Sequence, residues 1–371
     1  MTLEKKHGYS SQAKQYSNHK YAVSILQTVF LIVILSLFAG TGAANKLAGI
    51  VSGIFSPFFF AFAVYLGILY FVYFLVDFPL NFYQSFILEH RYFLTKQKIT
   101  DWFKDQAKGG GVFFILSFIS LSLFYYVMGH SPQYWWIVIS LFWIFFSIVL
   151  AQIAPVVILP LFFKYKPFTD EGLKQRIMIL AEKMGVNVCD VYEIDFSRKT
   201  LKANAAFLGI GKTKRVILAD TLLNKYSPDE VEVILAHEFA HYKYGHMWLL
   251  LLSNAASIIA SFYILFCMRN FLPGIFSLNS LTELAALPVV FLFWIVWGIL
   301  VRPLENFVSR CFERQADAGA IRTTGLKDSF ISSMEKIAGQ NLADRKPHPL
   351  IKFFFFDHPP IDERIEFAKK I

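Results

Sequence analysis

Residues 227 to 246 decide the fold, and they read Ser-Pro-Asp-Glu-Val-Glu-Val-Ile-Leu-Ala-His-Glu-Phe-Ala-His-Tyr-Lys-Tyr-Gly-His. The stretch contains an H-E-x-x-H motif, in which His237 and His241 stand four residues apart. On a helix, side chains at that spacing project from one face, one turn apart. Two imidazoles so placed can hold one zinc ion, and Glu238 beside them can accept a proton from a water molecule at that site.

The start of the stretch predicts a helix. Ser227 can cap it, Pro228 suits the first helical position, and Glu230 stands where a capping box needs a carboxylate. A pair of surface histidines on an amphipathic helix is the alternative interpretation. Most neighbouring residues are apolar, however, and a buried His-Glu-His cluster without a metal would carry a desolvation cost. We interpret His246 as a polar group near a membrane surface and not as a ligand.

The composition is that of a polytopic membrane protein. Of 371 residues, 56% are hydrophobic and 17% are charged, whereas soluble domains usually carry about 25% charged residues. The three cysteines show neither zinc-type nor disulfide-type spacing, so the prediction of zinc depends on His and Glu alone.

Apolar runs long enough to span a bilayer predict six membrane helices. The predicted spans are 21–40, 57–80, 111–129, 134–160, 247–268 and 285–302. A signal peptide is the alternative for the first run, but its length favours a retained anchor. The small residues of 41–55 predict a loop or a re-entrant piece, and the zinc helix is expected to continue without a break into the fifth span.

The remaining chain is polar to mixed and predicts a domain outside the membrane spans, with a small β-sheet beside the H-E-x-x-H helix. After a polar hinge at 164–170, the expected elements are a helix at 170–185, strands at 191–196, 203–210 and 215–219, a turn at 211–214, and helices at 304–321 and 326–339. We therefore divide the chain into a membrane region (1–160), a protease segment (161–246), two further spans (247–302) and a C-terminal protease segment (303–371).

The basic residues predict the topology. The segments before span one, between spans two and three, between spans four and five, and after span six hold 34 of the 36 Lys and Arg residues, counting Arg302 at the very end of span six. The positive-inside rule then places both termini and both zinc-bearing segments in the cytoplasm, in a bacterial inner membrane or the endoplasmic reticulum. The net charge of +9 thus indicates a lipid bilayer as the partner and not nucleic acid, with binding of acidic lipid or substrate as a secondary possibility.

A third protein ligand is expected just after span six. Glu313 and Asp317 lie four residues apart, so Glu313 can bind the metal while Asp317 accepts the other N–H of a ligating histidine. Glu305 is an alternative ligand. An ordinary helical ion pair between Arg310 and Glu313 is an equally plausible interpretation of the spacing.

Taken together, these motifs resemble the zinc-type CAAX prenyl protease family, membrane metalloendopeptidases related to HtpX. The resemblance rests on the H-E-x-x-H motif, on residues 309–317, on Asn204-Ala205 with the segment 215–223, and on His358-Pro359-Pro360 with Arg364. It covers roughly residues 75 to 371 and implies a gluzincin-type fold: mainly α, with about six membrane helices and a small cytoplasmic sheet.

The resemblance also implies roles for particular residues. His237, His241 and Glu313 would be the ligands of one Zn²⁺, Glu238 the general base and later proton donor, and Asp317 the residue that orients a ligand. Asn204 and Ala205 would lie on an edge strand that pairs with the substrate backbone. The residues expected near the scissile carbonyl or the substrate's C-terminus are Asn306, Arg310 and His358, although a loop-closing turn remains an alternative for His358.

Two features depart from the family pattern. Eukaryotic members have seven spans, whereas six are found here, because residues 41 to 56 are too short for the seventh. Ala206 also stands where an aromatic residue often follows the Asn-Ala pair. Both features bear on substrate choice and leave the hydrolytic centre untouched.

The function expected from this sequence is that of a membrane zinc metalloendopeptidase that removes the C-terminal tripeptide from prenylated proteins. The alternative within that class is quality control of membrane proteins, as in HtpX. A transporter would be expected to carry charged residues in mid-span, and a non-catalytic scaffold would be expected to lack Glu238 or a ligand.

Overall fold

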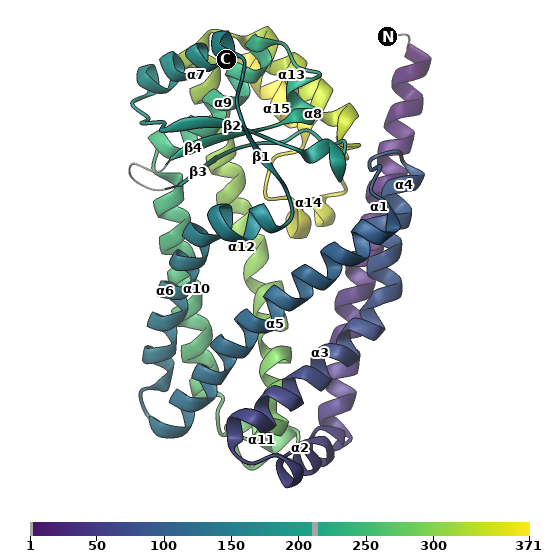
Figure 1. The fold of residues 1–371 in the computed structure, drawn as a ribbon, viewed down its shortest axis with the longest axis vertical. Coiled ribbons are helices and arrows are strands. Elements are labelled where there is room, and N and C mark those ends of the chain that lie inside the picture. The colour runs from purple at the N-terminus through teal and green to yellow at the C-terminus, as the bar shows by residue number, and fades with distance from the viewer. Residues whose placement is uncertain (1–2, 210–213) are drawn as a thin grey trace.

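The computed structural model describes residues 3–209 and 214–371, with side chains from residue 11 onward. A bundle of long helices carries a domain with a small sheet at one end (Figure 1). Helix α1 begins at this end, and the chain also finishes there. We call it the protease end.

Six described helices are long and apolar enough to cross a membrane, as the sequence predicts. They cover Ser11–Gly40, Phe58–Arg91, Ile99–His130, Trp135–Leu161, His246–Cys267 and Leu284–Thr324. Their elements are α1 (Leu3–Gly40), α3 (Phe58–Phe82) continued by η1 (Tyr83–Ile87) and α4 (Leu88–Arg91), α5 (Ile99–His130), α6 (Trp135–Ile153) continued by η2 (Ala154–Ile158) and η3 (Leu159–Leu161), α10 (His246–Cys267), and η6 (Leu284–Ala286) leading into α12 (Leu287–Thr324).

Residues expected as a loop or re-entrant piece form a helix, α2 (Ala43–Ile54). It buries Ala44, Ala48 and Val51 against the bundle, a period of three to four residues that the small side chains hid from the sequence analysis. Twelve residues reach only about 18 Å at 1.5 Å per residue, so α2 is too short to cross a bilayer.

Helix α12 joins the last span to the segment predicted to hold the third ligand. The sequence analysis expected a span at 285–302 and a separate helix at 304–321, but the structure has one helix of 38 residues with Pro303 inside it. The division of the chain into four segments stays a prediction. The helix nevertheless runs across the boundary at 302–303, so one continuous helix belongs to both the membrane part and the protease part.

The protease end contains a four-stranded mixed sheet in the order β1-β2-β4-β3. Its strands are β1 (Tyr165–Pro167), β2 (Asp190–Ile194), β3 (Ala205–Leu208) and β4 (Arg215–Ala219). Strands β2 and β4 are parallel, while β1 and β3 are antiparallel to their neighbours. β1 lies in the expected hinge, and the expected turn at 211–214 falls mostly outside the described residues.

Helices pack around this sheet and share its hydrophobic core. They are α7 (Glu171–Met184), α8 (Asp220–Leu223), α9 (Pro228–Lys243), α13 (Lys327–Gln340) and α15 (Ile361–Lys370), with the short η4 (Phe196–Arg198) and the end of α12. Helix α14 (Pro349–Phe355) adds no buried residue to this core, and α11 (Phe271–Ile275) lies at the opposite end of the molecule. A second core fills the membrane bundle.

Helix α9 begins as the sequence predicts and ends where it does not. The Ser227 side chain accepts from the Glu230 amide, and the Glu230 side chain accepts from the Ser227 amide, which completes the capping box. The expected continuous run into span five is wrong. Gly245, with φ of 70°, separates α9 from α10 in a left-handed conformation that glycine adopts without penalty.

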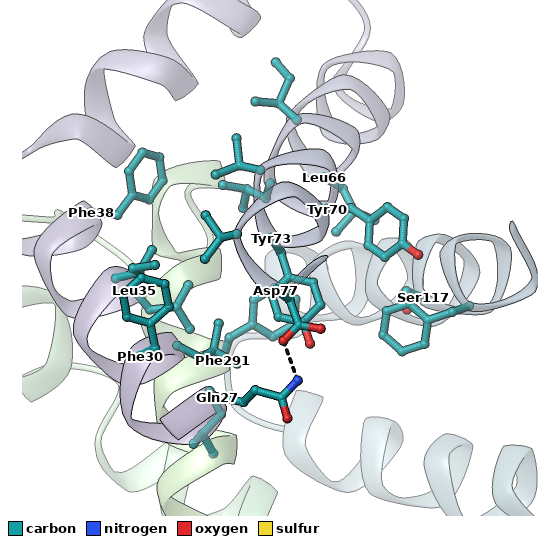
Figure 2. Close-up of a pocket in the computed structure, with 18 of the residues that line it drawn as sticks. Gln27, Phe30, Leu35, Phe38, Leu66, Tyr70, Tyr73, Asp77, Ser117 and Phe291 are labelled. Carbon is teal, nitrogen blue, oxygen red and sulfur yellow. Dashed lines mark hydrogen bonds between the residues drawn. The ribbon is translucent and has the colours of Figure 1, made fainter. Parts of the chain in front are cut away.

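The membrane bundle encloses an apolar cavity of about 490 Å³ between α1, α3, α5 and α12 (Figure 2). At its edge, Gln27 donates a hydrogen bond of 2.8 Å to Asp77. The predicted span two ends at residue 80, which would put Asp77 near its end, but the helical segment continues to Arg91, so this carboxylate lies well inside it.

Candidate metal centre

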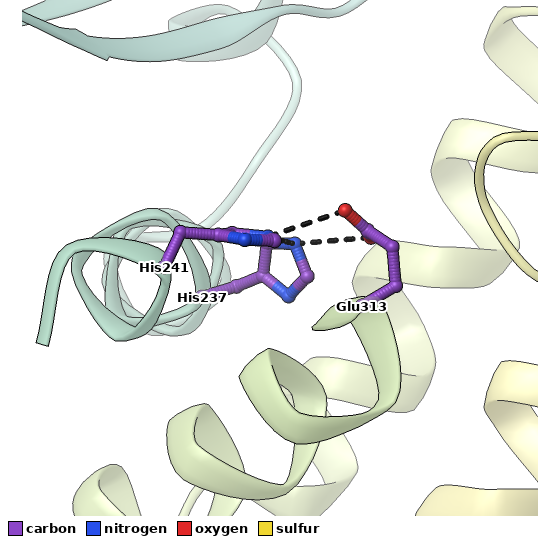
Figure 3. A group of neighbouring side chains, drawn as sticks. All are labelled: His237, His241 and Glu313. Atoms are coloured by element: carbon purple, nitrogen blue, oxygen red, sulfur yellow. Dashed lines mark hydrogen bonds and ion pairs between the residues drawn. The ribbon is translucent and has the colours of Figure 1, made fainter. Parts of the chain in front are cut away.

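Three side chains from two helices converge at the protease end (Figure 3). The Nε2 atoms of His237 and His241 lie 3.1 Å apart. Glu313 on α12 places its carboxylate oxygens 3.3 Å and 3.2 Å from these two nitrogens. One ligand atom from each residue lies within 4.8 Å of the others, a group that could hold a metal ion.

Close packing of α9 against α12 brings these groups together. A Cβ atom on Gly319 of α12 would lie 2.8 Å from the Tyr244 hydroxyl and 3.2 Å from the Ala240 Cβ. A larger residue would require the Tyr244 side chain to move and Ala240 to shift by a few tenths of an ångström, so glycine suits the observed approach of the two helices. Ala240 and Ala316, both fully buried, keep the neighbouring contacts small. Glu313 is three residues from Ala316 and six from Gly319 on the same helix, so the contact also fixes its distance from the histidines.

A buried ion pair orients His237. Asp317, with no exposed surface, lies 2.8 Å from the Nδ1 of His237 and accepts hydrogen bonds of 2.9 Å and 2.5 Å from Arg364. Burial by itself would lower the pKa of His237, but hydrogen bonds to Asp317 and Glu313 outweigh it and raise this pKa to about 9. With its Nδ1 proton directed at Asp317, His237 presents Nε2 to the centre.

His241 is supported by neutral groups. Its Nδ1 lies 3.0 Å from the Nδ1 of His246, and the Nε2 of His246 lies 3.0 Å from the Oε1 of Gln315. His246 is 1% exposed and stacks on Phe312. The interpretation of His246 as a polar group at a membrane surface is therefore wrong, because the turn at Gly245 folds the ring back against His241.

The donor set suits a metal cation. Two imidazole nitrogens and a carboxylate are the ligands that divalent zinc takes in metalloproteases. Glu313 is buried, and its Oε2 forms no hydrogen bond of good geometry, although the Nδ1 of His358 lies 2.7 Å away. A buried oxygen in that state favours a cation beside it. Glu238 is half-buried, and none of the described residues donates a hydrogen bond to it, so its oxygens are available to water or substrate.

The structure also locates the remaining candidates on the C-terminal side. His358 pairs with Glu313 through Nδ1 at 2.7 Å, and the proximity of this carboxylate raises the pKa of His358. Asn306 and Arg310 point elsewhere. Asn306 donates to the carbonyl of Phe353, and Arg310 to those of Lys352 and Phe356, so both side chains hold the α14 segment. No Arg310–Glu313 ion pair forms between these two described residues.

Ala205 begins β3, and β3 is an edge strand with β4 as its only partner in the described sheet. Asn204 immediately precedes it, and its carbonyl accepts a hydrogen bond of 3.1 Å from the amide of Ala219. Phe207 of β3 packs on Phe239 of α9. The strand therefore lies beside the metal centre with one edge unpaired.

Two residues that contact the centre were missed or underused in the sequence analysis. His246 was set aside because it lies about 140° round an ideal continuous helix from His241. Gly245 was the signal that the helix does not continue. Arg364 entered only as part of a C-terminal motif, since no local pattern shows that it reaches Asp317, 47 residues away.

The fold and this centre define a class of protein: an integral-membrane metalloprotease in which the third candidate ligand is carried on an extended membrane helix. The particular family follows from two family models. One, for peptidase family M48, matches residues 167–371. The other, described as the CAAX prenyl protease N-terminal region with five membrane helices, matches residues 5–164. The chain belongs to peptidase family M48 and is a multi-pass membrane metalloendopeptidase of the CAAX-protease type.

Several relatives match over most of their length. A protein of Bacillus subtilis named as an uncharacterised metalloprotease, YhfN, is 30% identical over 96% of this chain and 85% of its own. CAAX prenyl protease 1 of Saccharomyces cerevisiae is 29% identical, and the match covers 81% of this chain and 70% of the yeast protein. The human homologue is 26% identical, over 80% of this chain and 70% of its own length. The crystal structure of S. mikatae Ste24p has the same fold, with a TM-score of 0.87 at 24% identity over 97% of this chain and 89% of that one.

Proposed function

We propose that the metal of this enzyme is one zinc ion, held by His237, His241 and Glu313. The observation that carries the proposal is the convergence of two imidazole Nε2 atoms and one buried carboxylate within 4.8 Å. Zinc takes three such ligands in catalytic sites and leaves a fourth position for water or substrate. When bound, it supplies Lewis-acid polarisation of a peptide carbonyl and a lowered pKa for water.

The chain's own residues supply the proton transfers. Glu238 has no described hydrogen-bond donor, so it accepts the proton of the attacking water and passes it to the leaving amine. His358 lies beside Glu313 with a raised pKa, which suits a cation that donates to the developing oxyanion. Asp317 keeps His237 in the ligating orientation.

The substrate backbone is proposed to pair with the free edge of β3, beginning at Asn204 and Ala205. An extended peptide added there would lie along α9, because Phe207 of the same strand packs on Phe239 within the H-E-x-x-H motif. Asn306 and Arg310 would act through α14, whose backbone they hold, by positioning the segment that leads to His358.

The proposed substrate is a protein with a prenylated C-terminus that loses its last three residues. Support comes from relatives named CAAX prenyl proteases that match this chain across both its membrane and its peptidase regions. Cleavage of misfolded or unassembled membrane proteins, as in HtpX, is the competing role. For topology, we propose that both termini and the metal centre face the cytoplasm, because 34 of 36 basic residues fall on that side of six spans.

The test compares a farnesylated CAAX peptide with its unprenylated twin, using protein purified in detergent. The expected result is preferential release of a tripeptide from the prenylated peptide. Equal or better cleavage of the bare peptide would replace CAAX processing with general membrane proteolysis.

The control variant is Glu238→Gln, which removes the base and keeps the ligands. We expect it to retain one zinc per chain and lose at least ~100-fold in turnover, as expected on removal of a general base. Turnover at the wild-type rate would overturn the assignment of Glu238. Wild-type protein that binds no zinc at all would overturn the metal assignment.

A further inference from the structure

The position of His246 allows it to fix the orientation and the tautomer of the His241 ring. It follows the Gly245 turn at the start of α10, and it is almost fully enclosed. Its two ring nitrogens contact two different partners, His241 on α9 and Gln315 on α12, each at 3.0 Å. Because Gln315 is two residues from Glu313, one helix carries both the third candidate ligand and the last member of this hydrogen-bonded chain.

The donor and acceptor roles in this chain can be assigned from its end. The Oε1 atom of Gln315 can only accept, so the Nε2 of a neutral His246 carries the proton. The Nδ1 of His246 is then an acceptor, and the contact at 3.0 Å requires that the Nδ1 of His241 donates to it. A neutral His241 with its proton on Nδ1 has a lone pair on Nε2, the atom that faces His237 and Glu313.

We propose that His246 and Gln315 are positioning residues that hold His241 in its metal-binding tautomer. The inference deepens the proposed zinc site and rests on it. The Nδ1 proton of His237 is held by a charged group, Asp317, whereas that of His241 is held by a neutral histidine and, behind it, a neutral amide. The two ligating imidazoles therefore present bare Nε2 atoms to one point by two different devices.

The orientation of the Gln315 amide sets which tautomer of His241 these hydrogen bonds favour. If the NH₂ group of Gln315 faced His246, every role in the chain would reverse. His246 would donate from Nδ1, His241 would accept at Nδ1, and the Nε2 of His241 would carry a proton directed at the other ligands. Gln315 is exposed, so it can be changed with little effect on folding.

The first experiment separates this role from packing by two changes at position 246. In His246→Asn, an amide oxygen attached to Cγ takes the place of Nδ1 and can accept from His241. In His246→Leu, the side chain fills the pocket but accepts nothing. We expect the leucine variant to bind zinc ~10- to 100-fold more weakly than wild type in competition with a chelator. The zinc affinity of the asparagine variant should stay much closer to that of wild type.

A purely structural role predicts the opposite order, because asparagine leaves a cavity and loses the stacking on Phe312, whereas leucine fills the space. Phe312→Leu serves as the control that removes the stacking alone. Zinc affinity is measured by chelator competition, the ligand field by the absorption spectrum of the cobalt-substituted protein, and folding by thermal unfolding. Equal affinities of the leucine variant and wild type would overturn the inference.

The second experiment reverses the donor and acceptor roles of this hydrogen-bonded series by changing its exposed member, Gln315. Gln315→Glu provides only acceptors and is expected to keep or increase zinc affinity, while Gln315→Lys provides only donors and is expected to lower it. Matched charge controls are Arg314→Gln and Glu363→Gln, which change the local charge by the same amounts outside the chain. If the zinc affinity of each variant at 315 equals that of its charge control, the hydrogen bonds from Gln315 through His246 have no role in orienting His241. If wild-type protein binds no zinc, it is the proposed function that fails, and not this inference alone.

Discussion

Removing the charge of Asp317 should weaken both the fold and the metal site. This carboxylate is fully buried and accepts from His237 at 2.8 Å and from Arg364 at 2.9 Å and 2.5 Å. In Asp317→Asn the shape is kept, but one acceptor oxygen becomes an NH₂ donor that faces donors. Arg364, whose side chain is 10% exposed, is left with Glu313 at 3.8 Å as its nearest carboxylate.

The magnitude has two parts. Breaking a buried ion pair by removing one partner costs about 3–5 kcal/mol of folding free energy, because an uncompensated charge stays buried. Loss of the carboxylate behind a ligating histidine lowers metal affinity by about 10- to 100-fold, or about 1.4–2.7 kcal/mol. We therefore expect a large fall in unfolding free energy without metal, and weaker zinc binding at neutral pH.

The assay is denaturant unfolding of metal-free protein in detergent, together with chelator competition for zinc. Asp229→Asn is the control, because its carboxylate pairs with Arg176 while half exposed and should contribute no more than about 1 kcal/mol. Adding Arg364→Met to Asp317→Asn should restore part of the stability, since the buried charge is then removed. A single variant as stable as wild type, or a double variant that is no better than the single one, would refute the reasoning.

Three further predictions concern stability. In metal-free protein, the pKa of His237 is raised to about 9, so its pairing with Asp317 stabilises the fold fully below pH 6.5. This stabilisation is lost as the pH rises through about 9, and the unfolding temperature should fall across that window. A flat profile would count against the pairing. Gly245→Ala should cost about 1–2 kcal/mol because φ is 70°, whereas Gly339→Ala in α13, with open space at its Cβ, should be neutral or stabilising in the same unfolding assay. Lys202→Met should cost about 1–3 kcal/mol because Glu89 is buried and loses a bond of 2.9 Å, while Lys104→Met, 3.7 Å from Asp101 and largely exposed, should change little.

Local patterns predicted most of the elements. Long apolar runs predicted the six membrane-length helices, and the capping box predicted the start of α9. The errors have physical causes. The small residues of α2 gave too weak an apolar signal for a helix, and Gly245 was read as part of a helix although its left-handed conformation ends one. The predicted boundary at 302–303 falls at Pro303, but the structure accommodates this proline inside one helix of 38 residues.

The sequence by itself determined the chemistry of the candidate ligands: which residues carry imidazole and carboxylate, that His237 and His241 share a helix face, and that Glu313 and Asp317 do too. These are consequences of the 3.6-residue period and need no long-range contact. Only the tertiary structure decided what stands behind each ligand. Arg364 reaches Asp317 from 47 residues away, and His246 reaches His241 because the helix breaks at Gly245. Such partners are set by the packing of α12 against α9 and α15, and helical periodicity carries no information about them.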